Sequence, residues 1–301
     1  MQSIRIAVVG FGNVGHEVLA SVLESRDMEL AGIVEVPEKI QKIRQSIRDV
    51  PVVSNVDELG EVHVAILAVA SRSVEEIAPQ YLEKGINTVD AFDIHGNSIL
   101  KLKNYLGPIA RANNSVAIVS AGWDPGTNSV VRVLMEAIAP RGVTYTNYGP
   151  GISLGHTVAV KAIDGVEDAV SITVPKGNGE HKRLVYVKMK ENRNFEEVAE
   201  IIKRDPYFVR DHTYVFKVDD VEAIVDMGHG VRIERKGVSG KTHNQRMEFI
   251  MSVTNPAATA QLMVSAARAS MKQKPGSYTL LEIPPIDFLW GDRDANISRL
   301  L

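Results

Sequence analysis

The chain has 301 residues, enough for two domains, and its 45% hydrophobic and 24% charged content is ordinary for a globular protein. A formal net charge of −3 gives no basic footprint for nucleic acid or an anionic membrane. The lack of cysteine excludes disulfides, thiolate metal sites and a cysteine nucleophile. No apolar run approaches the roughly 18 to 20 residues of a membrane span, and the N-terminus enters a strand pattern at once. We therefore expect a cytoplasmic protein with a small-molecule substrate.

The first 120 residues alternate strand and helix patterns. Residues 62–69 are apolar on both faces, as in a buried parallel strand. This alternation predicts a Rossmann-type α/β fold with a doubly wound parallel sheet. The expected strands are 4–9, 28–34, 62–69, 87–90 and 116–119, and the expected helices cover about 14–23, 74–84 and 96–113.

The pattern changes after about residue 140, where strand-like segments follow one another mostly without helices. They predict a second α+β domain with a largely antiparallel sheet. Pro256 then opens an Ala-rich helix that runs to about Lys274, and we expect this helix to pack on the first domain. The predicted division is 1–120 with 256–301 as a dinucleotide-binding domain, and 121–255 as a substrate-binding and dimerisation domain. The later strands are expected near 143–148, 169–175, 184–190, 213–218, 230–236 and 245–253.

A glycine-rich loop follows the first strand and matches G-x-G-x-x-G. Gly10 allows a tight turn, Gly12 lets the backbone approach a pyrophosphate, and Gly15 lets the helix pack closely on the strand. The helix N-terminus favours the anion. The loop therefore predicts a dinucleotide cofactor, although a glycine-rich turn without ligand is the plain alternative. The predicted cofactor-binding loop comprises Gly10, Phe11, Gly12, Asn13, Val14 and Gly15.

Glu35 ends the second strand, 20 residues after Gly15, where an acidic side chain accepts hydrogen bonds from the adenosine ribose. A carboxylate there repels a 2′-phosphate, so the local chemistry favours NAD over NADP. The alternative is an exposed glutamate on a loop, with Lys39 nearby to soften the repulsion.

Further candidate residues lie at the carboxyl ends of later strands, where open α/β sheets bind ligands. Asp93 follows one such strand, and Trp123 and Asp124 follow another. Two acids beside a nicotinamide suit a substrate with an ammonium group. The alternative is that the aspartates cap helices and Trp123 fills a gap. The segment expected near the nicotinamide comprises Ala70, Ser71, Arg72 and Ser73.

The second half of the chain offers polar groups of the opposite character. Thr173 lies on a strand, Arg183 follows a loop, His229 stands between two glycines, and Asn255 begins the last long helix. Arginine binds two carboxylate oxygens at once, so Arg183 suits an acidic substrate group. The alternatives are surface charge, a turn residue and a helix cap. The eight histidines show no metal-binding spacing, so we predict no metal.

Several segments together resemble the meso-diaminopimelate dehydrogenase family over nearly the full length, especially its shorter, broad-specificity branch. The resemblance implies reversible oxidative deamination of the D-centre of meso-2,6-diaminopimelate, giving L-2-amino-6-oxopimelate and ammonia with hydride transfer to the nicotinamide. It also implies a homodimer. The matching segments, besides the glycine loop, are "DAFDIHG" (90–96), "SAGWDPG" (120–126), "YGPGISLGH" (148–156), "HGV" (229–231), "KGVSG" with "THN" (236–244) and "TNPAATAQ" (254–261).

The resemblance also implies residue roles. Asp93, Trp123 and Asp124 would surround the reacting D-centre, with the two aspartates near its amino group as candidate bases. Further contacts with that end would come from Tyr148 and from the backbone of Leu154 and Gly155, while the distal L-amino acid end would be held by Thr173, Arg183, His229 and Asn255.

Two positions depart from the family pattern. Relatives usually carry basic residues after the second strand, suited to NADP, whereas this chain has Glu35. Leu154 stands where relatives place a longer or more polar side chain, which could change the substrates that fit. Two alternative functions therefore stay open: a general D-amino acid dehydrogenase with another natural substrate, and a non-catalytic dinucleotide-binding redox sensor.

Overall fold

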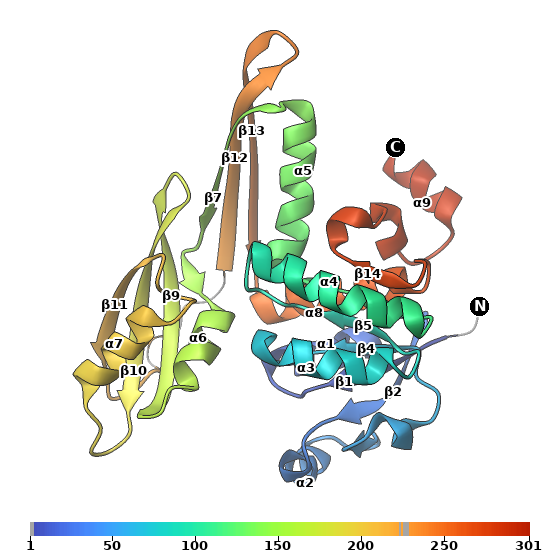
Figure 1. Ribbon diagram of the computed structural model, residues 1–301, viewed down its shortest axis with the longest axis horizontal. Helices are drawn as coiled ribbons and strands as arrows, with labels where there is room; N and C mark the ends of the chain where they lie inside the picture. The colour runs from blue at the N-terminus through green and yellow to red at the C-terminus, as the bar shows by residue number, and fades with distance from the viewer. Residues whose placement is uncertain (1–2, 223, 225–228) are drawn as a thin grey trace. The chain divides into compact units, whose positions relative to one another are not determined.

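The computed structural model describes residues 3–222, 224 and 229–301, which form two compact units (Figure 1). Unit 1 comprises residues 1–130 and 256–301, and unit 2 comprises residues 131–255. Chain segments on either side of unit 2 thus build one unit. The C-terminal segment, residues 256–301, belongs to the same unit as the N-terminal sheet.

Unit 1 is built on a seven-stranded parallel sheet with the order β14-β6-β5-β4-β1-β2-β3. This confirms the predicted Rossmann-type sheet. Its strands are β1 (Ile4–Val9), β2 (Met28–Val34), β3 (Val52–Val53), β4 (Val64–Leu67), β5 (Asn87–Asp90), β6 (Val116–Ile118) and β14 (Gly276–Tyr278). Its helices are α1 (Asn13–Leu23), α2 (Pro37–Ser46), α3 (Ser71–Leu82), α4 (Asn97–Ala112), α8 (Asn255–Ser270) and α9 (Arg293–Leu300).

Both faces of this sheet are buried, because neighbouring residues of each strand enter different hydrophobic clusters. In β1, Ile6 and Val8 pack with residues of α1 and α8, whereas Ala7 and Val9 pack with residues of α3 and α4. This two-sided burial explains why the strands read as continuous apolar runs. It also leaves the carboxyl ends of the strands as the place where polar side chains gather.

Unit 2 contains a four-stranded sheet, β11-β10-β9-β8, and a three-stranded antiparallel sheet, β13-β12-β7. The 11-residue helix α5 begins in the last residues of unit 1 and continues into unit 2. The elements are α5 (Asn128–Ile138), β7 (Arg141–Tyr148), β8 (Gly151–Ile152), α6 (Leu154–Lys161), β9 (Val166–Gly177), β10 (Glu180–Met189), α7 (Phe195–Arg204), β11 (His212–Lys217), β12 (His229–Ser239) and β13 (Thr242–Val253).

The structure adds two helices, α6 and α7, to the run of strands expected in this region. Asn194 caps α7 by accepting hydrogen bonds from the amides of Glu196 and Glu197, and Val198 and Ile202 bury one face of the helix. Because α7 connects β10 to β11, these two strands pair in parallel, while the other described pairs of unit 2 are antiparallel.

Candidate functional site

The glycine loop between β1 and α1 has the geometry of a phosphate-binding turn. Gly10 has a φ of +85°, and a Cβ there would lie 2.7 Å from the Ala68 carbonyl oxygen. A Cβ on Gly15 would lie 2.3 Å from the Gly10 carbonyl oxygen, whereas no described heavy atom lies within 4 Å of a Cβ on Gly12. No side chain caps α1 at Gly12. Open space therefore lies where a pyrophosphate would meet the helix amides.

Glu35 lies against this loop and not on an exposed surface. Its Oε2 accepts a hydrogen bond from the Phe11 backbone N–H at 3.0 Å, and Oε1 accepts one from the Val36 N–H at 2.9 Å. Lys39 Nζ lies 3.4 Å from both oxygens, and the Glu35 side chain is only 7% exposed. The carboxylate thus ties the end of β2 to the glycine loop.

The segment after β4 meets the segment after β5. Ser71, the first residue of α3, donates from Oγ to Asp93 Oδ1 at 2.6 Å, and the Asp93 backbone N–H donates to Ser71 Oγ at 3.1 Å. This reciprocal pair brings one of the candidate nicotinamide-side residues into contact with one of the candidate acids. Asp93 is partly buried.

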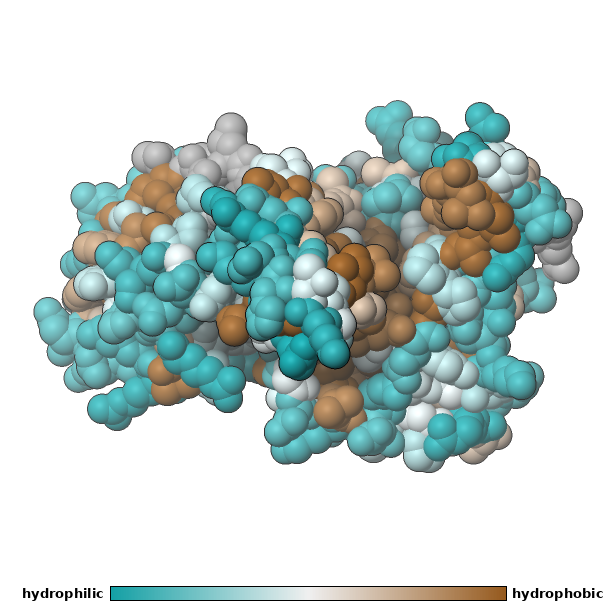
Figure 2. Space-filling view, turned by 90° about the horizontal axis from the view of Figure 1, so that it is seen from above, coloured by the Kyte–Doolittle hydropathy of each residue, from teal (hydrophilic) through white to brown (hydrophobic). Residues whose placement is uncertain are grey.

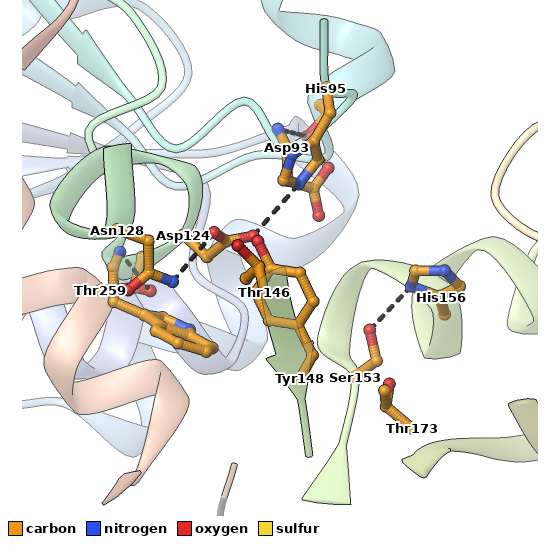
Figure 3. Close-up of polar contacts among 12 residues, drawn as sticks. Asp93, His95, Asp124, Asn128, Thr146, Tyr148, Ser153, His156, Thr173 and Thr259 are labelled. Atoms are coloured by element: carbon orange, nitrogen blue, oxygen red, sulfur yellow. Dashed lines mark hydrogen bonds and ion pairs between the residues drawn. The ribbon is translucent and has the colours of Figure 1, made fainter. Parts of the chain in front are cut away.

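Asp124 lies after β6 in a short π-helical turn, Trp123–Thr127, and follows the nearly fully buried Trp123. Its Oδ2 lies 3.1 Å from His95 Nε2, and its Oδ1 accepts a hydrogen bond from Asn128 Nδ2 at 3.0 Å (Figure 3). The His95 side chain is 51% exposed and that of Asp124 is 13% exposed. Asp124 therefore sits between a partly solvated imidazole and a buried amide, both from unit 1.

In unit 2, Arg183 is buried and faces Thr173 across the β9–β10 pair. Its guanidinium donates from Nη1 to Thr173 Oγ1 and from Nε to Asp211 Oδ2, the latter at 2.6 Å. The alternative of a surface charge is wrong, because only 9% of Arg183 is exposed. Asp211 was not a sequence candidate: it precedes β11, 28 residues after Arg183, and no motif marks it.

Close backbone packing brings the other candidates of unit 2 to the same region. Gly149 has a φ of +91°, and a Cβ there would lie 2.4 Å from the Thr173 carbonyl oxygen. The Gly149 N–H also donates to the Gly230 carbonyl at 2.8 Å, beside His229. Tyr148 precedes Gly149, so Tyr148, Thr173 and His229 are neighbours through this one glycine.

An arginine and a histidine that sequence reasoning missed form hydrogen bonds with Tyr148. Arg132 Nη2 donates to the Tyr148 hydroxyl at 2.7 Å, and the Tyr148 backbone N–H donates to His181 Nε2 at 2.7 Å. Neither Arg132 nor His181 belongs to a recognisable motif, so only the fold reveals them.

The remaining candidates lie at helix starts. Leu154 and Gly155 open α6, which the Ser153 N–H ties to β9 through the Ser171 carbonyl at 2.9 Å. Asn255 opens α8, two residues after the end of β13. In the ranges that the structure describes, no three His, Asp or Glu side chains form a potential metal site. Within the same ranges, no helix has the length and apolarity to cross a bilayer.

The parallel sheet, the open glycine loop and the acid at the end of β2 define a Rossmann-type dinucleotide-binding protein. Comparisons with known proteins agree. Residues 122–180 match the family "Diaminopimelic acid dehydrogenase C-terminal domain", and residues 1–94 match a "CoA binding domain" family.

Curated relatives give a closer assignment. The chain is 53% identical to a meso-diaminopimelate D-dehydrogenase of Bacteroides fragilis over the full length of both proteins. It is 32% identical to the corresponding protein of Corynebacterium glutamicum, over 95% of each chain. The chain therefore belongs to the meso-diaminopimelate D-dehydrogenase family.

Two solved structures share this fold along the whole chain. One is a diaminopimelate dehydrogenase from C. glutamicum in complex with diaminopimelate, with a TM-score of 0.87, 29% identity and full coverage of both chains. The other is an engineered D-amino acid dehydrogenase bound to NADP+, with a TM-score of 0.87, 28% identity and full coverage of both chains.

Proposed function

We propose that this protein reversibly deaminates the D-centre of meso-2,6-diaminopimelate, releasing ammonia and L-2-amino-6-oxopimelate. The observation that carries the proposal is the full-length likeness to a meso-diaminopimelate D-dehydrogenase at 53% identity. The positions of Asp93 and Asp124 support the proposal, because both acids follow the carboxyl ends of strands in the parallel sheet, where such sheets bind ligands. Because the chain belongs to a family of dehydrogenases, we do not retain the alternative of a non-catalytic redox sensor.

In this proposal, unit 1 binds NAD(P) through the glycine loop and residues 70–73. When bound, the nicotinamide supplies the hydride acceptor, and the protein supplies orientation and local charge. Glu35 favours NAD, because its nearly buried carboxylate, held beside the glycine loop, would face the adenosine ribose. Lys39 moderates this preference, since its ammonium group lies 3.4 Å from both carboxylate oxygens.

The two strand-end acids would bind the ammonium group of the D-centre and take up the proton that the amine must lose before hydride can leave. Asp93 and Asp124 both stay candidates for this role. Trp123 would form one wall beside the reacting carbon. For Asp124, the half-exposed His95 at 3.1 Å offers the proton a path toward solvent.

Unit 2 would bind the substrate and support dimerisation. Tyr148 and the start of α6 at Leu154 and Gly155 would contact the D-centre end. The distal amino acid group would be held by Thr173, Arg183, His229 and Asn255. Arg183 suits a carboxylate because the Thr173 and Asp211 contacts fix the plane of its guanidinium.

A second candidate function is general D-amino acid dehydrogenase activity, and Leu154 favours it. An apolar residue at the start of α6 would accept substrates that lack polar groups there. Arg183→Ala distinguishes the two functions. We expect it to lower kcat/KM for meso-diaminopimelate by about 100-fold, because a buried anion partner is lost, and to change kcat/KM for D-alanine by less than about threefold.

The matched control is Arg193→Ala, which removes a half-exposed arginine of the same unit that pairs with Asp164. It should leave both kcat/KM values unchanged. Equal losses on the two substrates in Arg183→Ala would contradict the distal-carboxylate role.

We also propose a homodimer and a cytoplasmic location. The face of the molecule in Figure 2 is largely hydrophilic, with separate apolar patches. In unit 2, large apolar side chains stay exposed on α5 and on the three-stranded sheet, where Arg235 ties β12 to the Ala139 carbonyl at the end of α5. Exposed apolar surface of this kind favours protein association. These side chains are Val133, Leu134, Ile138, Val143 and Ile250.

A further inference from the structure

A buried carboxyl group joins the two loops that carry the candidate acids. Asp90, the last residue of β5, is fully buried. Its Oδ1 accepts hydrogen bonds from the backbone N–H groups of Phe92 and Ser120, each at 2.9 Å. Its own carbonyl oxygen accepts a third from the Ala121 N–H at 2.7 Å. Asp90 thus forms hydrogen bonds with both the loop that follows β5 and the loop that follows β6.

These bonds begin where the sheet ends. The β5–β6 ladder pairs Thr88 with Ala117 and Val89 with Ile118, and it goes no further. Beyond it, the Asp90 side chain supplies the acceptor that a strand carbonyl would otherwise provide. Ser120 has a φ of +59°, in the left-handed region that a residue with a side chain rarely adopts, so its conformation depends on such a tether.

The tethered loops lead directly to the candidate acids. Asp93 is the third residue after Asp90, and Asp124 is the fourth residue after Ser120. A buried amide without an acceptor is unfavourable, so loss of the Asp90 carboxyl would release both loops toward other partners.

We propose that Asp90 is a positioning residue that holds the β5 and β6 loops, and thereby Asp93 and Asp124, at the spacing that the reaction requires. The role assigned to Asp93 and Asp124 rests on the proposed function. The tether itself rests only on the three hydrogen bonds.

The charge of Asp90 should affect this role. Burial raises the pKa of its carboxyl to about 6, although the Ser120 and Phe92 amides act to lower it. Oδ2 has no hydrogen-bond partner among the described residues. The flanking strands β4 and β6 carry no titratable residue. Titratable groups on α3 and on the two loops are Arg72, Glu75, Glu76, Tyr81, Asp93, His95 and Asp124, and none of them contributes to the shift of the Asp90 pKa.

Ionised Asp90 accepts charge-assisted hydrogen bonds, which are roughly twice as strong as neutral ones. The two amide hydrogen bonds to Oδ1 should therefore be stronger above pH 6 than below it, although burial of the charge opposes ionisation.

Three variants test the proposal: Asp90→Ala, Asp90→Asn and, as a matched control, Thr88→Val. Thr88 lies on the same face of β5, is equally buried, and its hydroxyl has no partner among the described residues. The measurements are kcat and KM for meso-diaminopimelate, the cofactor Kd, and amide hydrogen exchange in residues 91–93 and 120–122.

We expect Asp90→Ala to lower kcat by about 100-fold, since a misplacement of about 1 Å has this effect, while the cofactor Kd changes less than about threefold. Asp90→Asn keeps an acceptor at Oδ1 and should recover at least about tenfold of that loss. The kcat of the unaltered protein should change near pH 6, where Asp90 titrates, and the kcat of Asp90→Asn should not. Thr88→Val should match the unaltered protein, and only Asp90→Ala should speed exchange in both loops.

Loss of cofactor binding in proportion to kcat, or the same kcat for Asp90→Ala and Thr88→Val, would overturn the proposal. If Asp90→Ala does not fold, the dependence of kcat on pH is compared between Asp90→Asn and the unaltered protein. The same dependence in both proteins contradicts the role. If the unaltered protein does not oxidise meso-diaminopimelate, the proposed function fails, and the exchange rates still show whether Asp90 holds the loops.

Discussion

The hydrogen bonds and ion pairs of the candidate site residues determine which further groups these residues can bind. Asp211 compensates the charge of Arg183 and Thr173 orients its guanidinium, so a substrate carboxylate would meet an arginine that is already held in place. Asp124 contacts the imidazole of His95 and accepts a hydrogen bond from the amide of Asn128. The sequence analysis names Arg183 and Asp124 as candidates. It does not predict Asp211, because contacts between distant chain segments depend on the fold.

Glu35 gives a prediction at the residue scale. Glu35→Arg should shift the ratio of kcat/KM for NADP to that for NAD upward by at least about tenfold, because a cation replaces a carboxylate beside the adenosine ribose. Steady-state kinetics with both cofactors measure the ratio. Glu38→Arg, an exposed position in the first turn of α2, is the control and should leave the ratio within about twofold. A higher kcat/KM with NADP in the unaltered protein would contradict the predicted NAD preference.

Asp90 gives a second prediction, on stability. Its pKa is raised from 3.8 to about 6 in the folded protein, so the folded state binds a proton more tightly than the unfolded state. The contribution of this group is therefore full below about pH 4 and is lost as the pH rises through 6. At about 1.4 kcal/mol per pKa unit, the loss is about 3 kcal/mol.

The free energy of unfolding of the unaltered protein should thus fall between pH 4 and pH 7, relative to that of Asp90→Asn, by this order of magnitude. Denaturant titrations of both proteins at the two pH values measure the difference. A difference that is independent of pH would show that Asp90 does not titrate in this range.

At the scale of elements, two glycines of one loop should behave differently. Gly12→Ala adds a Cβ with no described heavy atom within 4 Å, so stability should change by less than about 1 kcal/mol. Cofactor affinity should still fall at least about tenfold, because the methyl group lies where the pyrophosphate would approach. Gly15→Ala places a Cβ 2.3 Å from the Gly10 carbonyl oxygen and should lower stability by about 2 kcal/mol or more.

Thermal unfolding and cofactor titration separate the two effects. If Gly12→Ala binds cofactor as tightly as the unaltered protein, the pyrophosphate does not pass over this glycine.

The sequence predicts elements well where one local signal dominates. The parallel strands of unit 1 are buried on both faces, so their apolar runs stand out, and the glycine loop has fixed spacing. The predictions for unit 2 were less complete. Helix α7 buries only a narrow face, at Val198, Ala199 and Ile202, within an otherwise charged segment, and α6 is eight residues long. The contacts of the candidate site residues could not be predicted, because they depend on close approaches between distant segments, such as that of Gly149 to Thr173.

At the scale of the whole molecule, the proposed dimer makes a testable prediction. The double variant Leu134→Glu with Ile250→Glu places charges on side chains that are 60% and 67% exposed, on α5 and β13. It should convert a dimer into monomers in sedimentation analysis. Val209→Glu, at a 62% exposed position between α7 and β11, is the control and should leave the mass unchanged. A monomeric unaltered protein would contradict the proposed assembly.

The most direct test of the central claim compares stereoisomers of the substrate. The protein is incubated with NAD or NADP and with either meso- or LL-diaminopimelate, and reduction of the nicotinamide is followed by absorbance. We predict reduction with the meso isomer, accompanied by one equivalent of ammonia, and at least about a hundredfold lower rate with the LL isomer, which has no D-centre to place beside the candidate acids. Equal rates with both isomers, or no reduction with the meso isomer and either cofactor, would contradict the proposed function.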